Sequence, residues 1–271
     1  MNILITLNRS YLKVALVMLF SLWRNNADEK IDIYVLSKDL RENDFLPFLG
    51  SSMSFHVICP ALNLSEALTT RRYPQEMYYR LFAFSFLPES VDRILYLDPD
   101  IIVNKSLKEL YSTDLGTAYT AGCTHVREVL TKINSKRLNT DSATAYLNTG
   151  VLLMNISLIR RDFTKEEIEK TIIENRSRLL LPDQDVLVIL FKDRILTLDS
   201  IKYNLSDRIY ALSRIAGMKN LDPAYVEENT VIIHFCGRNK PWKESYHGLL
   251  GKFFDYYRVK AESYFSSLRI S

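Results

Sequence analysis

Short apolar runs alternate with a helix-like segment along the first sixty residues, and this alternation restricts the folds open to the chain. Residues 2–7, 31–36 and 55–59 read as short buried strands. Residues 11–23 between the first two are apolar all round, which is typical of a core helix. A strand–helix–strand order implies a parallel sheet covered by helices, because parallel neighbours need a crossover connection. We therefore expect an α/β fold.

The remainder of the chain continues the pattern without a break. A helix is expected at about 75–88, strands at 93–97, 118–124, 150–154 and 231–235, and a charged helix at 165–179. The polar span 127–144 is interpreted as a lid or a substrate-side insertion. No Gly/Pro/Ser-rich linker and no internal repeat divides the sequence, which predicts a single domain.

The C-terminal tail, residues 246–271, is considered separately from the main domain. Apolar residues recur in it at helical spacing, interleaved with Lys252, Arg258 and Lys260. A basic aromatic helix of this kind suits an anionic membrane surface, and it suits equally a helix packed on the domain. Both interpretations stay open at this stage, with residues 1–245 as the main domain.

Composition excludes several functional classes. The chain has only 8 glycines and contains no G-x-G-x-x-G or G-x-x-x-x-G-K-[ST] motif, so enzymes that hold phosphate on a glycine loop are poor candidates. A net charge of +3 without a dense Lys/Arg run argues against nucleic-acid partners. Three scattered cysteines favour a reducing compartment, and the apolar stretch 14–23 is too short to cross a bilayer. We expect a cytoplasmic protein, in contact with the inner face of the membrane if the tail binds it.

Two acidic residues follow the strand at 93–97. Asp98 and Asp100 flank Pro99 where that strand ends, and open α/β sheets bind ligands beyond the carboxyl ends of their strands. Two carboxylates so close together would repel unless a cation lay between them, and Mg²⁺ or Mn²⁺ prefers such ligands. The other interpretation is a surface turn, for which Asp-Pro-Asp is common chemistry.

Other polar groups could complete such a site. His234 ends the run 231–235 and could be a further metal ligand, while Gly237 and Lys240 offer a close backbone approach and a charge to phosphate. A lone histidine of this kind is also a common core residue. Arg80, inside an apolar helix, could snorkel to solvent or reach a diphosphate.

Two further segments carry amide and carboxylate side chains. Asp183, Gln184 and Asp185 open a predicted helix after Pro182, where acidic residues are also favoured by the helix dipole alone. Asn148 begins the Asn-Thr-Gly segment before a strand, which also fits a plain turn.

Taken together and in their order along the chain, these segments resemble the glycosyltransferase family 8 pattern, which includes glycogenin and the bacterial lipopolysaccharide galactosyl- and glucosyltransferases. The resemblance covers residues 2–242, nearly the whole chain. The matching segments are the first strand through Thr6 with Asn8-Arg9-Ser10-Tyr11, Tyr78-Tyr79-Arg80-Leu81, Leu95-Tyr96-Leu97-Asp98-Pro99-Asp100, Leu147-Asn148-Thr149-Gly150-Val151, Pro182-Asp183-Gln184-Asp185, and His234-Phe235-Cys236-Gly237 with Lys240-Pro241-Trp242.

The resemblance implies a GT-A fold and retaining transfer of a hexose from a UDP-sugar to the hydroxyl of a saccharide acceptor. It implies that Asp98, Asp100 and His234 hold Mn²⁺ or Mg²⁺, and that Arg80, Gly237 and Lys240 address the diphosphate. It implies that the nucleotide is bound by Thr6, Asn8 and Tyr11, with the Tyr11 ring stacked on uracil. It implies that the transferred sugar is contacted by Asn148, Asp183, Gln184 and Asp185. Asn8 departs from the pattern, because the family usually carries an acidic residue there.

The proposed mechanism depends on Gln184. A double displacement needs a carboxylate nucleophile, as in retaining glycosidases. The matching position holds Gln184, whose amide is a weak nucleophile, and Asp185 is the carboxylate next to it in sequence. We therefore favour attack by the acceptor on the same face of the sugar that the diphosphate leaves. A haloacid-type phosphatase and a nucleotidyltransferase fit poorly, because Ile102 and the segment after the first strand depart from their motifs. A non-catalytic sugar-nucleotide-binding protein of the same fold is the alternative that stays open.

Overall fold

A seven-stranded sheet forms the centre of the molecule, with strand order β3-β2-β1-β4-β7-β6-β8. The computed structural model describes residues 1–62, 75–125, 128–141 and 144–268. The strands of the sheet are β1 (Asn2–Thr6), β2 (Ile31–Leu36), β3 (Met53–Ile58), β4 (Arg93–Leu97), β6 (Thr120–Thr124), β7 (Leu147–Asn155) and β8 (Ile195–Thr197). β5 (Ile101–Val103) and β9 (Ile232–His234) pair in a second, two-stranded sheet beside it. The predicted α/β class is confirmed.

The central sheet is mostly parallel. β1 pairs in parallel with β2 and β4, β2 with β3, and β6 with β8. β7 runs antiparallel to both β4 and β6, and the ladder shifts register between Gly122 and Cys123. Asn148, Thr149 and Gly150 lie inside β7 and do not form a turn before it. This long strand therefore carries its own polar residues to the edge where β4 ends.

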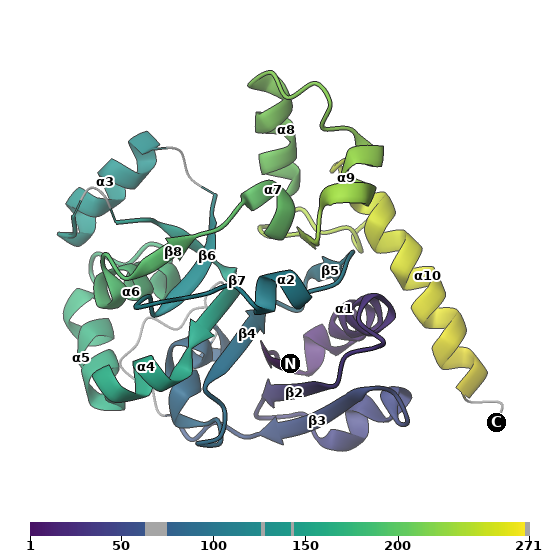
Figure 1. Cartoon of the computed structure of the whole chain (residues 1–271), viewed down its shortest axis with the longest axis horizontal. Coiled ribbons are helices and arrows are strands. Elements are labelled where there is room, and N and C mark those ends of the chain that lie inside the picture. The colour runs from purple at the N-terminus through teal and green to yellow at the C-terminus, as the bar shows by residue number, and fades with distance from the viewer. Residues whose placement is uncertain (63–74, 126–127, 142–143, 269–271) are drawn as a thin grey trace.

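Helices cover both faces of the sheet (Figure 1). They are α1 (Leu12–Asn25), α2 (Lys108–Tyr111), α3 (Glu128–Leu138), α4 (Ile156–Asp162), α5 (Lys165–Asn175), α6 (Pro182–Phe191), α7 (Ser200–Tyr203), α8 (Asp207–Ile215), α9 (Pro223–Asn229) and α10 (Gly251–Leu268), with 3₁₀ helices η1 (Arg9–Tyr11), η2 (Glu42–Phe48), η3 (Gln75–Met77) and η4 (Tyr79–Ser85). Alternate residues of each strand enter opposite cores: Leu95 and Leu97 pack with α1 and α10, and Ile94 and Tyr96 pack with η4, α5 and α6.

The segment expected to be one helix at 75–88 consists of the two 3₁₀ helices η3 and η4. Within η4, residues 79–84 are all buried, so this segment lacks the exposed face that an amphipathic α-helix would present to solvent. Packing between the sheet and α4, α5 and α6 determines the geometry here, and it buries Arg80.

The tail packs on the domain. α10 lies along α1, and Phe253, Phe254 and Tyr257 are buried in the same core as β1 and β4 (Figure 1). Asn25 at the end of α1 donates a hydrogen bond to Tyr257 Oη (2.7 Å). Phe253, Phe254 and Tyr257 are therefore core residues, whereas Tyr256 of the same tail is exposed. Among the described residues, no helix has both the length and the apolarity needed to cross a membrane.

The span 127–144 contains α3, and residues 127, 142 and 143 lie outside the described residues, as do 269–271 of the tail. In chain order, α3 is the element between β6 and β7 (Figure 1).

Candidate active site

A cavity of about 630 Å³ lies at the carboxyl ends of β1 and β4 and brings most of the predicted site residues together. This is the edge at which open α/β sheets bind their ligands. The predicted residues that line it are Thr6, Asn8, Tyr11, Arg80, Asp98, Asp100, Asn148, Asp183, Gln184, His234 and Gly237. Asp185 and Lys240 are predicted residues that do not line it.

Asp98, Asp100 and His234 form a compact group of metal-ligand side chains. One ligand atom from each lies within 4.8 Å of the others. His234 Nε2 is 3.6 Å from Asp98 Oδ2 and 3.3 Å from Asp100 Oδ1. The pairing of β5 with β9 explains the approach, because it sets Ile101 opposite His234. Two carboxylate oxygens and one imidazole nitrogen are a donor set that fits Mg²⁺ or Mn²⁺.

The imidazole of His234 is oriented by Asn204, a residue that sequence reasoning did not single out. His234 Nδ1 lies 2.8 Å from Asn204 Oδ1, which accepts the Nδ1–H bond and so turns the Nε2 edge of the ring toward the carboxylates. Asn204 is fully buried, and its Nδ2 donates to Asn148 Oδ1 (3.1 Å). Asn148 Oδ1 also accepts from Gly150 N (3.1 Å), which leaves Nδ2 of Asn148 at the cavity wall.

Asp98 is held by two neighbours through one of its oxygens. Its Oδ1 accepts a hydrogen bond from Tyr96 Oη (2.6 Å) and lies 3.1 Å from Arg80 Nη2. Tyr96 in turn contacts Thr6 Oγ1 (3.1 Å), so the predicted nucleotide-side residue Thr6 acts on Asp98 through Tyr96. The second oxygen, Oδ2, is the one that faces His234. Tyr96 thus joins the site, and its place directly before the Leu-Asp-Pro-Asp motif was the available signal.

Arg80 binds carboxylates and a backbone carbonyl in this structure. Besides Asp98, it lies 3.4 Å from Asp183 Oδ2, donates to Thr149 O (2.8 Å) and stacks 4.3 Å from the Tyr96 ring centroid. Burial raises the pKa of Asp183, and the opposing effects of Arg80 and Thr149 only partly offset it. The guanidinium therefore ties the strand-end carboxylate to the start of α6.

Asp183 and Gln184 face the cavity from the first turn of α6, and Asp185 faces away from it. The Asp185 carboxylate is fully buried and accepts bonds from Arg137 Nη1 (2.9 Å), Arg137 Nη2 (2.7 Å) and Tyr146 Oη (2.7 Å). It also accepts from the backbone N of Leu180 (2.6 Å). Its predicted place at the transferred sugar is therefore corrected: Asp185 anchors α6 to α3 and β7, because a helix turns successive side chains to different sides.

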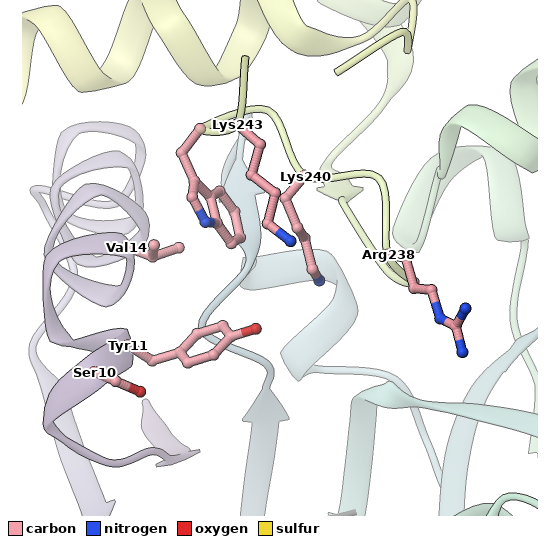
Figure 2. A pocket seen from close by; sticks show the side chains of 8 residues that line it. Ser10, Tyr11, Val14, Arg238, Lys240 and Lys243 are labelled. Atoms are coloured by element: carbon pink, nitrogen blue, oxygen red, sulfur yellow. The ribbon is translucent and has the colours of Figure 1, made fainter. Parts of the chain in front are cut away.

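Lys240 binds Asp100 and lies behind it. Its Nζ contacts Asp100 Oδ2 and donates to Phe235 O (2.8 Å). Burial alone would raise the pKa of Asp100, but Lys240 and His234 outweigh burial and hold it below its ordinary value, so this carboxylate is ionised. Lys240 opens onto an adjoining pocket of about 460 Å³, into which the Tyr11 ring also points (Figure 2).

Tyr11 is placed to stack on a planar ligand. Its side chain is 37% exposed, and its ring meets Trp242 edge to face with centroids 6.2 Å apart. Gly237, between the two pockets, has a φ of +89°, a left-handed conformation that favours glycine. His125, which also lines the main cavity, is a second residue that sequence reasoning missed. Burial lowers its pKa to about 4, so it is neutral at pH 7.

A model of glycosyl transferase family 8 matches residues 2–245 of the chain. That range includes the whole central sheet and every side chain of the site just described. The chain belongs to glycosyltransferase family 8. The resemblance seen in the motifs is thereby confirmed, and the protein is a glycosyltransferase.

Relatives of this family 8 enzyme include two that act on lipopolysaccharide. The lipopolysaccharide 1,2-glucosyltransferase of Escherichia coli is 26% identical over 252 residues, 88% of this chain and 72% of that protein. The lipopolysaccharide 1,3-galactosyltransferase of Salmonella typhimurium is 27% identical over 194 residues, 66% of this chain and 52% of that protein. In fold, the chain resembles the galactosyltransferase LgtC solved with donor and acceptor sugar analogues, with a TM-score of 0.77, 22% identity and 96% of each chain covered. The predicted GT-A architecture is confirmed by this likeness.

Proposed function

We propose that this enzyme transfers a glucosyl or galactosyl group from a UDP-sugar to a saccharide hydroxyl, with retention of configuration and with a divalent cation. The observation that carries the proposal is the joint position of the Asp98, Asp100 and His234 group and of Gln184 on one cavity. The names of the two lipopolysaccharide transferases support glucose or galactose as the sugar and a glycan as the acceptor.

The residues present suit Mn²⁺ or Mg²⁺. Asp98 Oδ1 and Asp100 Oδ2 are bound by cationic or hydroxyl neighbours, which leaves Asp98 Oδ2, Asp100 Oδ1 and His234 Nε2 as the converging donors. A cation held there would neutralise charge that develops on the departing diphosphate.

The donor would lie across both pockets. Tyr11, partly exposed beside Trp242, would stack on the uracil ring, and Thr6 and Asn8 would lie near the nucleoside. Lys240 and the backbone at Gly237 would meet the phosphates, in place of the glycine loop that the sequence lacks. Arg80 would act on the diphosphate mainly through Asp98, because it is buried against that carboxylate.

The transferred hexose would lie against Asn148, Asp183 and Gln184. Asn148 Nδ2 and the Gln184 amide can donate to sugar hydroxyls, and Asp183 can accept from one. Gln184 is a poor nucleophile and Asp185 is fully engaged away from the cavity. Same-face attack follows: the acceptor oxygen bonds to the anomeric carbon as the bond to the diphosphate breaks, and the leaving phosphate oxygen takes the acceptor proton.

The test is release of UDP from UDP-glucose and UDP-galactose with and without Mn²⁺. Gln184→Ala should keep UDP affinity and lose most turnover, and Asn229→Ala, an exposed amide on α9, serves as the control. Loss of UDP binding in Gln184→Ala would contradict its assigned role at the sugar. A wild-type protein that is stabilised by UDP at 100 times its Kd, about 2.7 kcal/mol, yet turns over neither donor would support the non-catalytic alternative.

A further inference from the structure

Two arginines of the main cavity have no partner among the described residues. Arg208, in the first turn of α8, and Arg238, in the loop after β9, both line the cavity and are both exposed. Neither guanidinium makes a hydrogen bond or ion pair with any described residue of the chain. Neither was singled out by the motifs.

The other charged side chains at the cavity wall have partners among the described residues. Arg80 meets Asp98 and Asp183, Lys240 meets Asp100, and Glu76 accepts a hydrogen bond from Asn8 Nδ2 (3.3 Å). The acidic neighbour of Arg208 is turned away as well, because Asp207 accepts from Tyr246 Oη (2.7 Å) and from the backbone N of Leu249 (2.8 Å). The two arginines are therefore cations at the cavity that no described carboxylate pairs with, and such exposed guanidiniums attract an anion.

The fold places the two arginines after neighbouring segments of the chain. His234 N donates to Leu205 O (2.8 Å), which holds the segment leading into α8 beside β9. Arg208 and Arg238 follow these two segments by three and four residues. In Figure 2 the Arg238 guanidinium points away from both Tyr11 and Lys240. Arg238 lines the edge of the pocket that we assign to the nucleotide and is directed out of it, and Arg208 lines the main cavity alone.

We propose that Arg208 and Arg238 bind an anionic group, phosphate or carboxylate, on the acceptor saccharide. This inference rests on the proposed function, because a metal ion and Lys240 are assigned there to the donor diphosphate. The planar guanidinium fork matches both oxyanions in bidentate geometry, and a charged pair of this kind selects one acceptor over its neutral counterpart.

The experiment measures binding to the full chain with Mg²⁺ and saturating UDP, so that the donor's phosphate site is filled. Glucose 6-phosphate and glucuronate are the charged probes and glucose is the neutral one, each titrated by ligand-detected NMR. The wild type should bind at least one charged probe about 10-fold or more tighter than glucose, the size expected for charge-assisted hydrogen bonds. Raising salt from about 0.05 to about 0.5 M should reduce this preference, because exposed charges are screened.

The variants are Arg208→Gln, Arg238→Gln and the double variant, with Lys219→Gln, an exposed lysine outside the cavity lining, as the matched control. With UDP kept saturating for each variant, the double variant should lose the preference for charged probes, while Lys219→Gln keeps it. A preference for glucose 6-phosphate alone identifies phosphate, and one for glucuronate alone identifies carboxylate.

Equal affinity of the wild type for charged and neutral probes would overturn the inference, and so would a preference that survives in the double variant. In both cases bound UDP leaves the proposed function standing. Failure of the wild type to bind UDP at all would overturn the proposed function and this inference with it.

Discussion

Gly150 offers a direct probe of the metal-ligand group, because its missing side chain makes room for His234. Gly150 lies in β7, and its carbonyl accepts a hydrogen bond from Asp98 N (2.8 Å). A Cβ added at Gly150 would lie 2.1 Å from His234 Cε1 and 2.8 Å from Asp98 Oδ2, whereas ordinary contacts are 3.4 Å or longer. Gly150→Ala therefore forces the imidazole to move by roughly 1 Å.

The size of the effect follows from how little room His234 has. The residue is 1% exposed and is bonded to Asn204, so it cannot turn out of the way without breaking that bond. Overpacking of this kind costs about 1–3 kcal/mol of stability. A shift of about 1 Å in a catalytic group costs about 100-fold in rate. We expect both losses, with weaker Mn²⁺ binding.

The assays are thermal unfolding, Mn²⁺ titration and UDP release. Gly150→Ala combined with His234→Ala removes the clashing ring, so the double variant should be more stable than the two separate losses added together, by about 0.5–3 kcal/mol of coupling, and should stay inactive. Wild-type Mn²⁺ affinity and turnover in Gly150→Ala would refute the reasoning.

Three other predictions follow from the described contacts. Arg137→Met leaves the buried Asp185 without its bidentate partner, so the free energy of unfolding should fall by about 1–3 kcal/mol in denaturant titrations. Turnover should fall more than UDP affinity. An unchanged unfolding midpoint would show that the Arg137–Asp185 pair does not hold α6. Burial lowers the pKa of His125 to about 4, below its unfolded value of 6.5, so the unfolded state gains a proton first as the pH falls. The contribution of neutral His125 to the free energy of unfolding is therefore fully present above pH 6.5. It falls by up to about 1.4 kcal/mol per pH unit toward pH 4. Melting curves of wild type and His125→Asn check this, and parallel pH profiles would contradict it. Tyr11→Ala should weaken UDP binding by about 10-fold through lost stacking on uracil, and calorimetric titration with UDP that gives an unchanged Kd would remove Tyr11 from the nucleotide site.

Local patterns were sufficient for most of the fold and for the grouping of Asp98, Asp100 and His234. Residues 94–97 are a short apolar run after Arg93, which favours a buried strand, and a strand that stops at Asp98-Pro99-Asp100 carries these carboxylates to the sheet edge. His234 ends a similar run, so its position at a strand end was predictable as well. What the pattern at 231–235 could not show is that this strand pairs with β5 instead of entering the central sheet.

Long-range contacts account for what sequence reasoning missed. Asn204 orients His234 from thirty residues away, and nothing in its own neighbourhood distinguishes it from other asparagines. Asp185 adjoins Gln184 in sequence, but its direction depends on Arg137, 48 residues away on α3. Periodicity reports which face of an element is buried, and it does not report which distant side chain meets a given carboxylate.

The two cavity arginines without described partners were hidden for the same reason. Arg208 and Arg238 are unremarkable in a sequence with 35 lysines and arginines. Only the partners of the other charged residues show that these two remain unmatched, and those partners come from strands and helices that are far apart along the chain.

The central claim is that Asp98, Asp100 and His234 hold a divalent cation on which sugar transfer depends. Its most direct test compares Mn²⁺-dependent UDP release from UDP-glucose and UDP-galactose by the wild type, by Asp100→Asn and by Asp193→Asn, an exposed aspartate outside the site. We predict release by the wild type and by Asp193→Asn that stops with a chelator, and a loss of about 1000-fold or more in Asp100→Asn, equivalent to several kcal/mol of transition-state stabilisation. Release by Asp100→Asn near the wild-type rate, or release that the chelator leaves unchanged, would contradict the account.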